Sequence, residues 1–108
     1  MTAPPHPGQT LRDRVLPGLG LSVSQAAREI RGARQTLHRV LAGTAAVTPD
    51  MAARLARLSG TSPRLWLDLQ QRHDIWHAER ALAAVLALIP ARTLPAAVRT
   101  RIGRPHDG

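Results

Sequence analysis

The sequence predicts an all-α protein of one domain with five helices, the fifth of which is extended toward the C-terminus. Apolar residues make up 44% of the 108 residues, yet Phe and Tyr are absent and there are only two Trp. A core built from Leu, Val, Ile and Ala is typical of helices rather than sheets. Apolar residues also recur at helical spacing, and residues that start or end helices separate these runs.

The first helix is expected after a loose N-terminal segment. Residues 1–8 are rich in Pro and are expected to be flexible. Leu11 and Val15 are four residues apart and predict a helix over about residues 9–16. The Pro17-Gly18 pair is expected to end this helix, because Pro lacks the amide hydrogen that a helix interior needs.

The second and third helices are predicted to be short and joined by a sharp turn. Ser22 and Gln25 have the spacing of a capping box, which predicts a helix over about residues 23–30. Gly32 follows and is expected to take the left-handed conformation that such a turn needs. The third helix is predicted over about residues 34–42 and is followed by a glycine.

The fourth and fifth helices have strong start signals. Thr48-Pro49-Asp50 combines an N-cap, a first-turn proline and an acidic residue, which predicts a helix over about residues 49–59. Ser62-Pro63 starts the fifth helix in the same way. This helix is expected to run unbroken as far as Ile89, because no Gly or Pro interrupts it.

Two short helices joined by a glycine-containing turn are typical of a helix-turn-helix, whose second helix enters the major groove of DNA. Arg can bond to guanine, and Gln to adenine, through two hydrogen bonds each. Arg34, Gln35 and His38 on the outer face of the third helix are therefore expected to read bases. A second set is expected to contact the phosphate backbone: Ser24, Gln25, Arg31, Thr36 and Arg39.

The charge of the chain agrees with a polyanionic partner. The formal net charge is +8, and all fifteen basic residues are Arg. A basic surface on a small domain attracts nucleic acid, an acidic protein or anionic lipid. A polar helix face is usually only solvated, and GC-rich coding also favours Arg. The capped short helix, the turn and the charge together nevertheless favour DNA.

Composition argues against several other classes of protein. The chain has no Cys, which excludes disulfides and thiolate chemistry. The apolar run at residues 81–90 is about half of the ~20 residues that a membrane span needs. The N-terminus has no signal-peptide pattern, so a cytoplasmic protein is expected. No nucleophile–base pair or cofactor-binding loop is recognised, so no enzymatic activity, cofactor or small-molecule substrate is expected.

The end of the fifth helix carries an apolar stripe that a monomer would leave exposed. Its residues are Leu82, Val85, Leu86 and Ile89. A second copy of the chain is the expected partner, and a two-fold dimer would set two reading helices about 34 Å apart, as adjacent major grooves require. The alternative is that the tail, residues 91–108, folds back onto the stripe. This tail is basic and is expected to be mobile apart from one short helix after Pro95.

His73 and His77 suggest a zinc hydrolase as another alternative. Two His four residues apart face one side of a helix, as in the H-E-x-x-H pattern of zinc proteases. Asp74 stands in place of the Glu, and the candidate third ligands Glu79 and His106 have no fixed spacing. Two half-exposed histidines beside a core Trp are the simpler interpretation, so no metal site is predicted.

Residues 6–80 also resemble the HigA family of antitoxins, a branch of the Xre/Cro-like helix-turn-helix proteins. The matching motifs are His6-Pro7-Gly8, Leu19-Gly20-Leu21-Ser22, Ala27, Arg34-Gln35, Gly43, Thr48-Pro49-Asp50-Met51-Ala52, Gly60-Thr61-Ser62-Pro63, Trp66-Leu67-Asp68-Leu69-Gln70 and Asp74-Ile75-Trp76. The resemblance implies a five-helix lambda-repressor-like domain that forms dimers. It also implies repression of the protein's own toxin–antitoxin operon and neutralisation of a RelE-like ribonuclease toxin.

Two positions depart from the family pattern. Members usually have Gln at the position of Val23, where it binds a phosphate, so Ser24 or Gln25 would have to take this role. The usual turn Gly is Arg31 here, with Gly32 one residue later. Either Arg31 adopts a strained left-handed conformation or the turn is shifted by one residue.

The sequence therefore predicts an antitoxin-type repressor that binds double-stranded operator DNA as a homodimer. Residues 9–80 would form the helix-turn-helix domain, and residues 81–108 would supply the dimer or partner contact. Two alternatives remain: a stand-alone Xre-type regulator, and a toxin-binding module with weak DNA binding.

Overall fold

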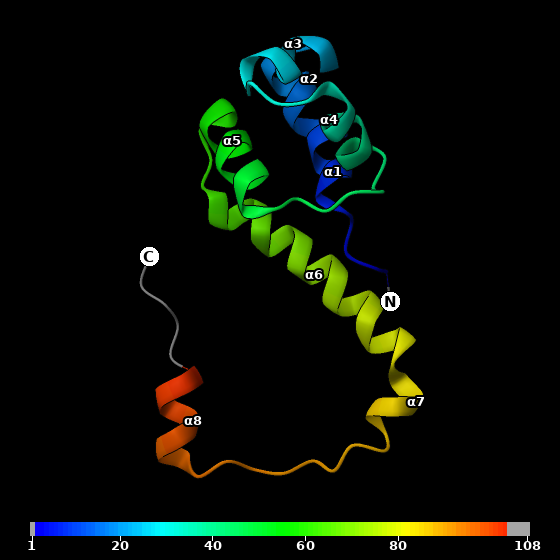
Figure 1. The fold of residues 1–108 in the computed structure, drawn as a ribbon, viewed down its shortest axis with the longest axis vertical. Helices are drawn as coiled ribbons and strands as arrows, with labels where there is room; N and C mark the ends of the chain where they lie inside the picture. Colours follow the sequence, from blue (N-terminus) through cyan, green and yellow to red (C-terminus); the bar gives the residue numbers. More distant parts are fainter. Residues whose placement is uncertain (1, 104–108) are drawn as a thin grey trace.

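The computed structural model describes residues 2–103, and every regular element in that range is helical. The longest helix is α6 (Pro63–Ala81), and the preceding elements form a bundle on one side of its first half (Figure 1). Those elements are α1 (Pro7–Thr10), η1 (Leu11–Val15), α2 (Leu16–Leu19), α3 (Val23–Glu29), α4 (Arg34–Leu41) and α5 (Pro49–Ser59). The short helices α7 (Ala83–Leu86) and α8 (Ala96–Gly103) follow α6 and lie away from the bundle. The predicted all-α class is confirmed.

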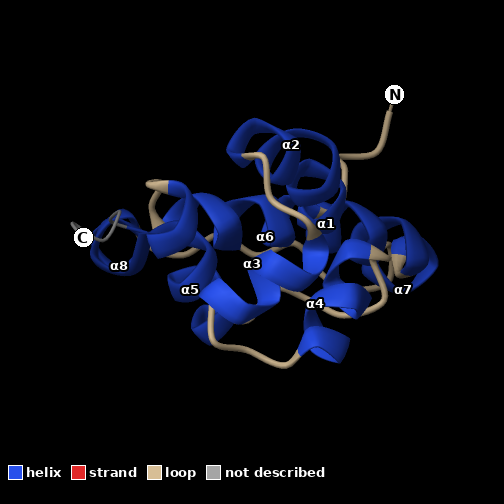
Figure 2. Ribbon diagram, turned by 90° about the horizontal axis from the view of Figure 1, so that it is seen from above, coloured by secondary structure: helices blue, strands red, loops and turns tan. Residues whose placement is uncertain are grey.

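The hydrophobic core lies inside this bundle, which Figure 2 shows from above. Trp66, Leu37 and Leu55 are among its largest fully buried side chains. Gln70 of α6 is a buried polar residue, and its Oε1 accepts a hydrogen bond of 2.8 Å from the Val47 amide. This bond ties the segment before α5 to α6.

The first helix differs from its prediction at both ends. α1, η1 and α2 follow one another without a break from Pro7 to Leu19, so the helix begins before residue 9 and does not end at Pro17. In the π-helical turn η1, the Leu16 amide donates to the Leu11 carbonyl, five residues back. This wider turn lets the helix continue through Pro17, which has no amide hydrogen to donate.

The predicted caps of three later helices are confirmed. In each case the hydroxyl of a Ser or Thr accepts a hydrogen bond from the amide three residues later, as N-caps do. The pairs are Ser22 with Gln25, Thr48 with Met51 and Ser62 with Leu65. These caps place the starts of α3, α5 and α6 where the sequence predicted them. α5 also ends as predicted, and α3 and α4 each end one residue earlier.

The expectation that the fifth helix runs unbroken to Ile89 is wrong. α6 ends at Ala81, Leu82 leaves the helical conformation with φ −99° and ψ 6°, and the single turn α7 follows. Every residue from His77 to Gly103 is exposed, so no core packing holds this part of the chain straight. The short helix expected after Pro95 is present as α8. Among the described residues, no helix combines the length and apolar character needed to cross a membrane.

Candidate nucleic-acid interface

Helix α4 is divided into an inner apolar face and an outer polar face. Leu37, Val40 and Leu41 are buried in the core. The side chains predicted to read bases, Arg34, Gln35 and His38, are all exposed. Because residues three or four apart share one face of a helix, burying the apolar stripe necessarily turns these donors outward.

The remaining predicted contact residues lie around this outer face. Arg31, Arg39 and Gln25 are exposed, whereas Ser24 and Thr36 are half-buried. Within residues 2–103, none of the side chains of Arg31, Arg34 and Arg39 forms a hydrogen bond or ion pair. These guanidinium groups therefore have their full hydrogen-bonding capacity available for a ligand.

The electrostatic character of this face is set by a long interval without acidic residues. No Asp or Glu occurs between Glu29 and Asp50, and three Arg occur there. Ala33 is the N-cap of α4 and provides no side-chain hydrogen bond, so the first-turn amides of α4 add partial positive charge. The outer face of α4 thus presents cations and hydrogen-bond donors without a competing carboxylate from its own segment.

Val23 is the residue at which the sequence departs from the family's usual phosphate-binding Gln. Its side chain is half-buried and packs against the core. Gln25 is exposed close by, and its backbone amide already donates to the hydroxyl of Ser22. A phosphate contact at the start of α3 would therefore have to come from the side chains of Ser24 or Gln25, as the sequence predicts.

The turn between α3 and α4 is built on Arg31, not on Gly32 as expected. Arg31 has a φ of +56°, in the left-handed region. Its amide donates to the Arg28 carbonyl oxygen, and the Gly32 amide donates to the Ala27 carbonyl oxygen. These two bonds form a Schellman motif. Of the two alternatives, the structure therefore has the strained one, at a cost of about 1–2 kcal/mol for a non-glycine residue.

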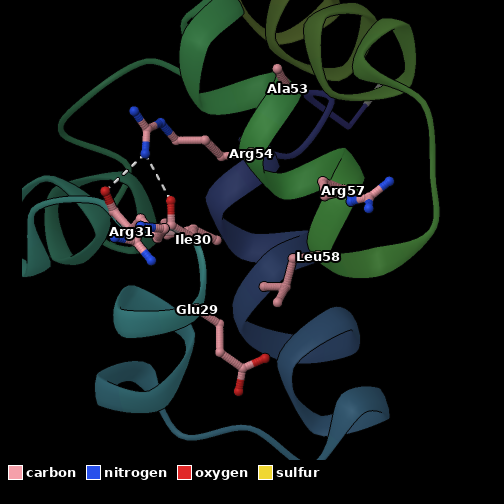
Figure 3. Close-up of a pocket in the computed structure, with 7 residues that line it drawn as sticks. All are labelled: Glu29, Ile30, Arg31, Ala53, Arg54, Arg57 and Leu58. Carbon is pink, nitrogen blue, oxygen red and sulfur yellow. Dashed lines mark hydrogen bonds between the residues drawn. The ribbon is translucent and has the colours of Figure 1, made fainter.

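Arg54 of α5 reaches across to this turn. Its Nη1 donates hydrogen bonds to the carbonyl oxygens of Ile30, at 2.8 Å, and Arg31, at 2.9 Å (Figure 3). The turn and α5 enclose an open cleft, whose lining includes Arg57 and Glu29. Arg54 is therefore a bridge between α5 and the turn that precedes α4.

Sequence reasoning did not identify the contact between Arg54 and this turn. Asp50 and Arg54 are four residues apart on α5 and form an ion pair, which the spacing alone indicates. The carbonyl groups that Arg54 binds are 23 and 24 residues away in sequence. No local pattern links positions at that separation, so only the fold shows this contact.

The apolar stripe after α6 remains uncovered. Its four residues are 43–57% exposed, and the described part of the tail does not fold back over them. The side chains in question are Leu82, Val85, Leu86 and Ile89. The structure thus leaves this surface available to a partner.

The histidines of the zinc alternative are engaged in other contacts. The ring of His73 lies 4.4 Å from that of His77 and 5.1 Å from that of His6, and its Nδ1 is 3.1 Å from the Pro4 carbonyl oxygen. Across residues 2–103, no three His, Cys, Asp or Glu side chains are grouped so that they could hold a metal ion. The candidate ligand His106 lies outside the described residues.

Comparison with known proteins agrees with this geometry. Residues 9–67 match a family described as a helix-turn-helix domain. The HTH-type transcriptional regulator YddM of Escherichia coli K12 is 37% identical over 78 residues, which are 72% of this chain and 82% of the relative.

Solved structures of antitoxins are also similar to this chain. Antitoxin GraA superposes with a TM-score of 0.79 at 31% identity, over 86% of this chain and 100% of GraA. Pseudomonas aeruginosa antitoxin HigA, solved with the higBA promoter, superposes with a TM-score of 0.78 at 28% identity, over 84% of this chain and 99% of HigA. Helix-turn-helix regulators and antitoxins bind DNA and are not enzymes. The chain belongs to the helix-turn-helix family, in the class that contains HTH-type transcriptional regulators and HigA/GraA-type antitoxins.

Proposed function

We propose that this protein is an antitoxin-type repressor that binds operator DNA through the outer face of α4. The observation that carries the proposal is the outward-facing set of Arg34, Gln35 and His38 on a helix whose other face is locked in the core. Arg34 would bond to guanine and Gln35 to adenine, with His38 reaching a further base. Related antitoxins have been solved with their DNA: HigA with the higBA promoter and GraA with its operator.

The phosphate contacts would surround these base contacts. Arg31 and Arg39 would bind phosphates at either end of α4, and Thr36 would add a hydroxyl. Ser24 and Gln25 would do the same from the start of α3. Repression would follow from occlusion, because a dimer bound across two half-sites would cover a promoter.

The dimer would form through the exposed stripe of Leu82, Val85, Leu86 and Ile89. Burying these side chains against a second copy removes apolar surface from water, which is the main driving force for association. In this proposal residues 9–80 form the DNA-binding unit, and the chain from residue 81 onward supplies the contact between protomers or with another partner. The complex would act in the cytoplasm, where operator DNA is accessible.

A selection experiment tests operator binding and identifies the sequence that is read. Purified protein is used to select duplexes from a randomised DNA library, and the selected duplex is compared with the DNA upstream of the protein's own gene. A shared palindromic site is the expected result. A selection that enriches no sequence would contradict the proposal and would favour the alternative of a partner-binding module with weak DNA binding.

We further propose that the protein neutralises a RelE-like toxin. The support is its similarity to the antitoxins GraA and HigA over more than four-fifths of the chain. A short reading frame is expected beside the gene of this protein, and its product is expected to arrest growth when expressed alone and to copurify with this protein when both are expressed. A neighbouring product that neither arrests growth nor binds would leave a stand-alone Xre-type regulator as the function.

A further inference from the structure

Arg54 lies outside the set of residues predicted to contact DNA, but it connects two parts of the fold. It stands on α5, yet its Nη1 donates to two carbonyl oxygens at the end of α3, those of Ile30 and Arg31. Carbonyl groups at a helix C-terminus lack partners within the helix and carry partial negative charge. A guanidinium group is therefore well matched to this position.

The Arg54 side chain is itself held in place. Its Nε donates to Oδ1 of Asp50, one turn earlier on α5. The guanidinium group is thus bonded on one side to a carboxylate and on the other to the turn. The same guanidinium group therefore links α5 to the turn, and Figure 3 shows its two bonds to the turn.

The turn determines the direction of the reading helix. α4 starts at Arg34, three residues after Arg31, and Ala33 provides no side-chain cap. The backbone conformation of Arg31 is one that L-residues rarely adopt, so it persists only where surrounding contacts hold it. The Arg54 bond to the Arg31 carbonyl is such a contact.

We propose that Arg54, aligned by Asp50, is a positioning residue that sets the angle at which α4 enters the major groove, without touching DNA itself. This inference rests on the proposed DNA-binding function. Base contacts require side chains to be placed within fractions of an ångström, whereas phosphate contacts tolerate more displacement. Loss of Arg54 should therefore weaken binding to the operator more than binding to DNA of unrelated sequence.

The test compares Arg54→Ala with Arg57→Ala, which removes the same charge from the same helix and the same cleft. Affinity is measured for the selected operator duplex and for a scrambled duplex, each over a range of salt, with folded dimer confirmed for every variant. We expect Arg54→Ala to lower operator affinity about tenfold with little change for the scrambled duplex and no change in salt slope. Arg57→Ala should reduce the binding of both duplexes to the same small extent.

A second variant uses the strain at Arg31. Glycine takes the left-handed conformation freely, so in an Arg31→Gly background the loss of operator affinity caused by Arg54→Ala should shrink to about threefold or less.

Asp50→Asn leaves Arg54 in place but weakens its alignment, so it should give a smaller loss of operator affinity of the same kind. This variant keeps the test informative should Arg54→Ala fail to fold.

The outcomes separate the possible roles. Equal losses on operator and scrambled DNA, with a salt slope reduced by about one, would identify Arg54 as a phosphate contact and overturn the inference. Unchanged operator preference in both Arg54→Ala and Asp50→Asn would also overturn it and leave the proposed function standing. Wild-type protein without any sequence preference would overturn the proposed function, and this inference with it.

Discussion

Gly8 of α1 lies directly against the backbone of Val40 in α4. A Cβ atom added to Gly8 would be 1.8 Å from the Val40 carbonyl oxygen, which is far inside any permitted contact. Only glycine therefore allows the first helix to cross so close to α4. The packing of the N-terminal helix and the placement of the proposed DNA interface are linked through this contact.

Gly8→Ala is expected to destabilise the protein by about 1–3 kcal/mol, because the first helix must move away from Val40 to make room for the methyl group. Unfolding in urea followed by circular dichroism measures the change. Gly18→Ala is the matched control, since a Cβ at Gly18 meets no atom within 4 Å and the residue lies inside α2. The control should be neutral or stabilising by about 0.5–1 kcal/mol, and a similar loss in both variants would contradict the proposed clash.

Gln70→Leu is expected to cost about 1–3 kcal/mol, although Leu is more apolar than Gln. The substitution leaves the buried Val47 amide without its acceptor, and an unsatisfied buried donor carries the full cost of its lost hydration. Thermal or urea unfolding measures the loss. The neighbouring exposed residue gives the control, since Gln71→Leu should change stability by less than about 0.5 kcal/mol.

Stability is expected to fall as the solution is made acidic, in part through His6. Burial and, to a smaller extent, the neighbouring His73 lower the pKa of His6. The unfolded chain, with an ordinary pKa of about 6.5, then binds a proton more readily than the folded protein. The contribution of His6 to stability is therefore complete above about pH 6.5 and is lost as pH falls through that value toward the lowered folded pKa. Urea midpoints at about pH 7.5 and about pH 5.5, on either side of this range, measure the loss.

His6→Asn isolates this effect from the capping role of the residue. Nδ1 of His6 accepts a hydrogen bond from the Gly8 amide at the start of α1, and an Asn side chain can accept the same bond without titrating. The variant should therefore lose less stability than the wild type between the two pH values. An identical pH dependence in both proteins would show that other groups account for the acid sensitivity.

Arg34→Ala is expected to weaken operator binding by about 1–3 kcal/mol and to relax the preference at one base position. Competition assays with operators substituted at single positions measure both effects. Arg72→Ala removes an exposed Arg from α6 and should leave base preference unchanged. Equal binding and equal preference in Arg34→Ala would remove Arg34 from the set of base-reading residues.

Leu86→Glu is expected to convert the proposed dimer into a monomer, because it places a charge within the stripe that two copies would bury. Sedimentation or light scattering measures the mass in solution. Leu88→Glu is the control: Leu88 is 83% exposed and lies outside the stripe. Dimers that persist equally in both variants would place the contact between protomers elsewhere.

Much of the fold could be predicted because its signals are local. The caps at Ser22, Thr48 and Ser62 act within one turn of their own helices, so residue identity alone was enough to predict them. The inward and outward faces of α4 follow from the period of the helix in the same way. The sequence by itself therefore determined where α3, α5 and α6 start and which donors of α4 face outward.

The tertiary structure decided the features that depend on residues far apart in the chain. The first helix continues past Pro17 because the π-helical turn η1 precedes it, and α6 ends at Ala81, where no core packing supports a longer helix. Arg31 rather than Gly32 takes the left-handed conformation, and Arg54 reaches it from α5. A local conformation of this kind is chosen by the free energy of the whole fold, since contacts made elsewhere outweigh a strain of about 1–2 kcal/mol at a single residue.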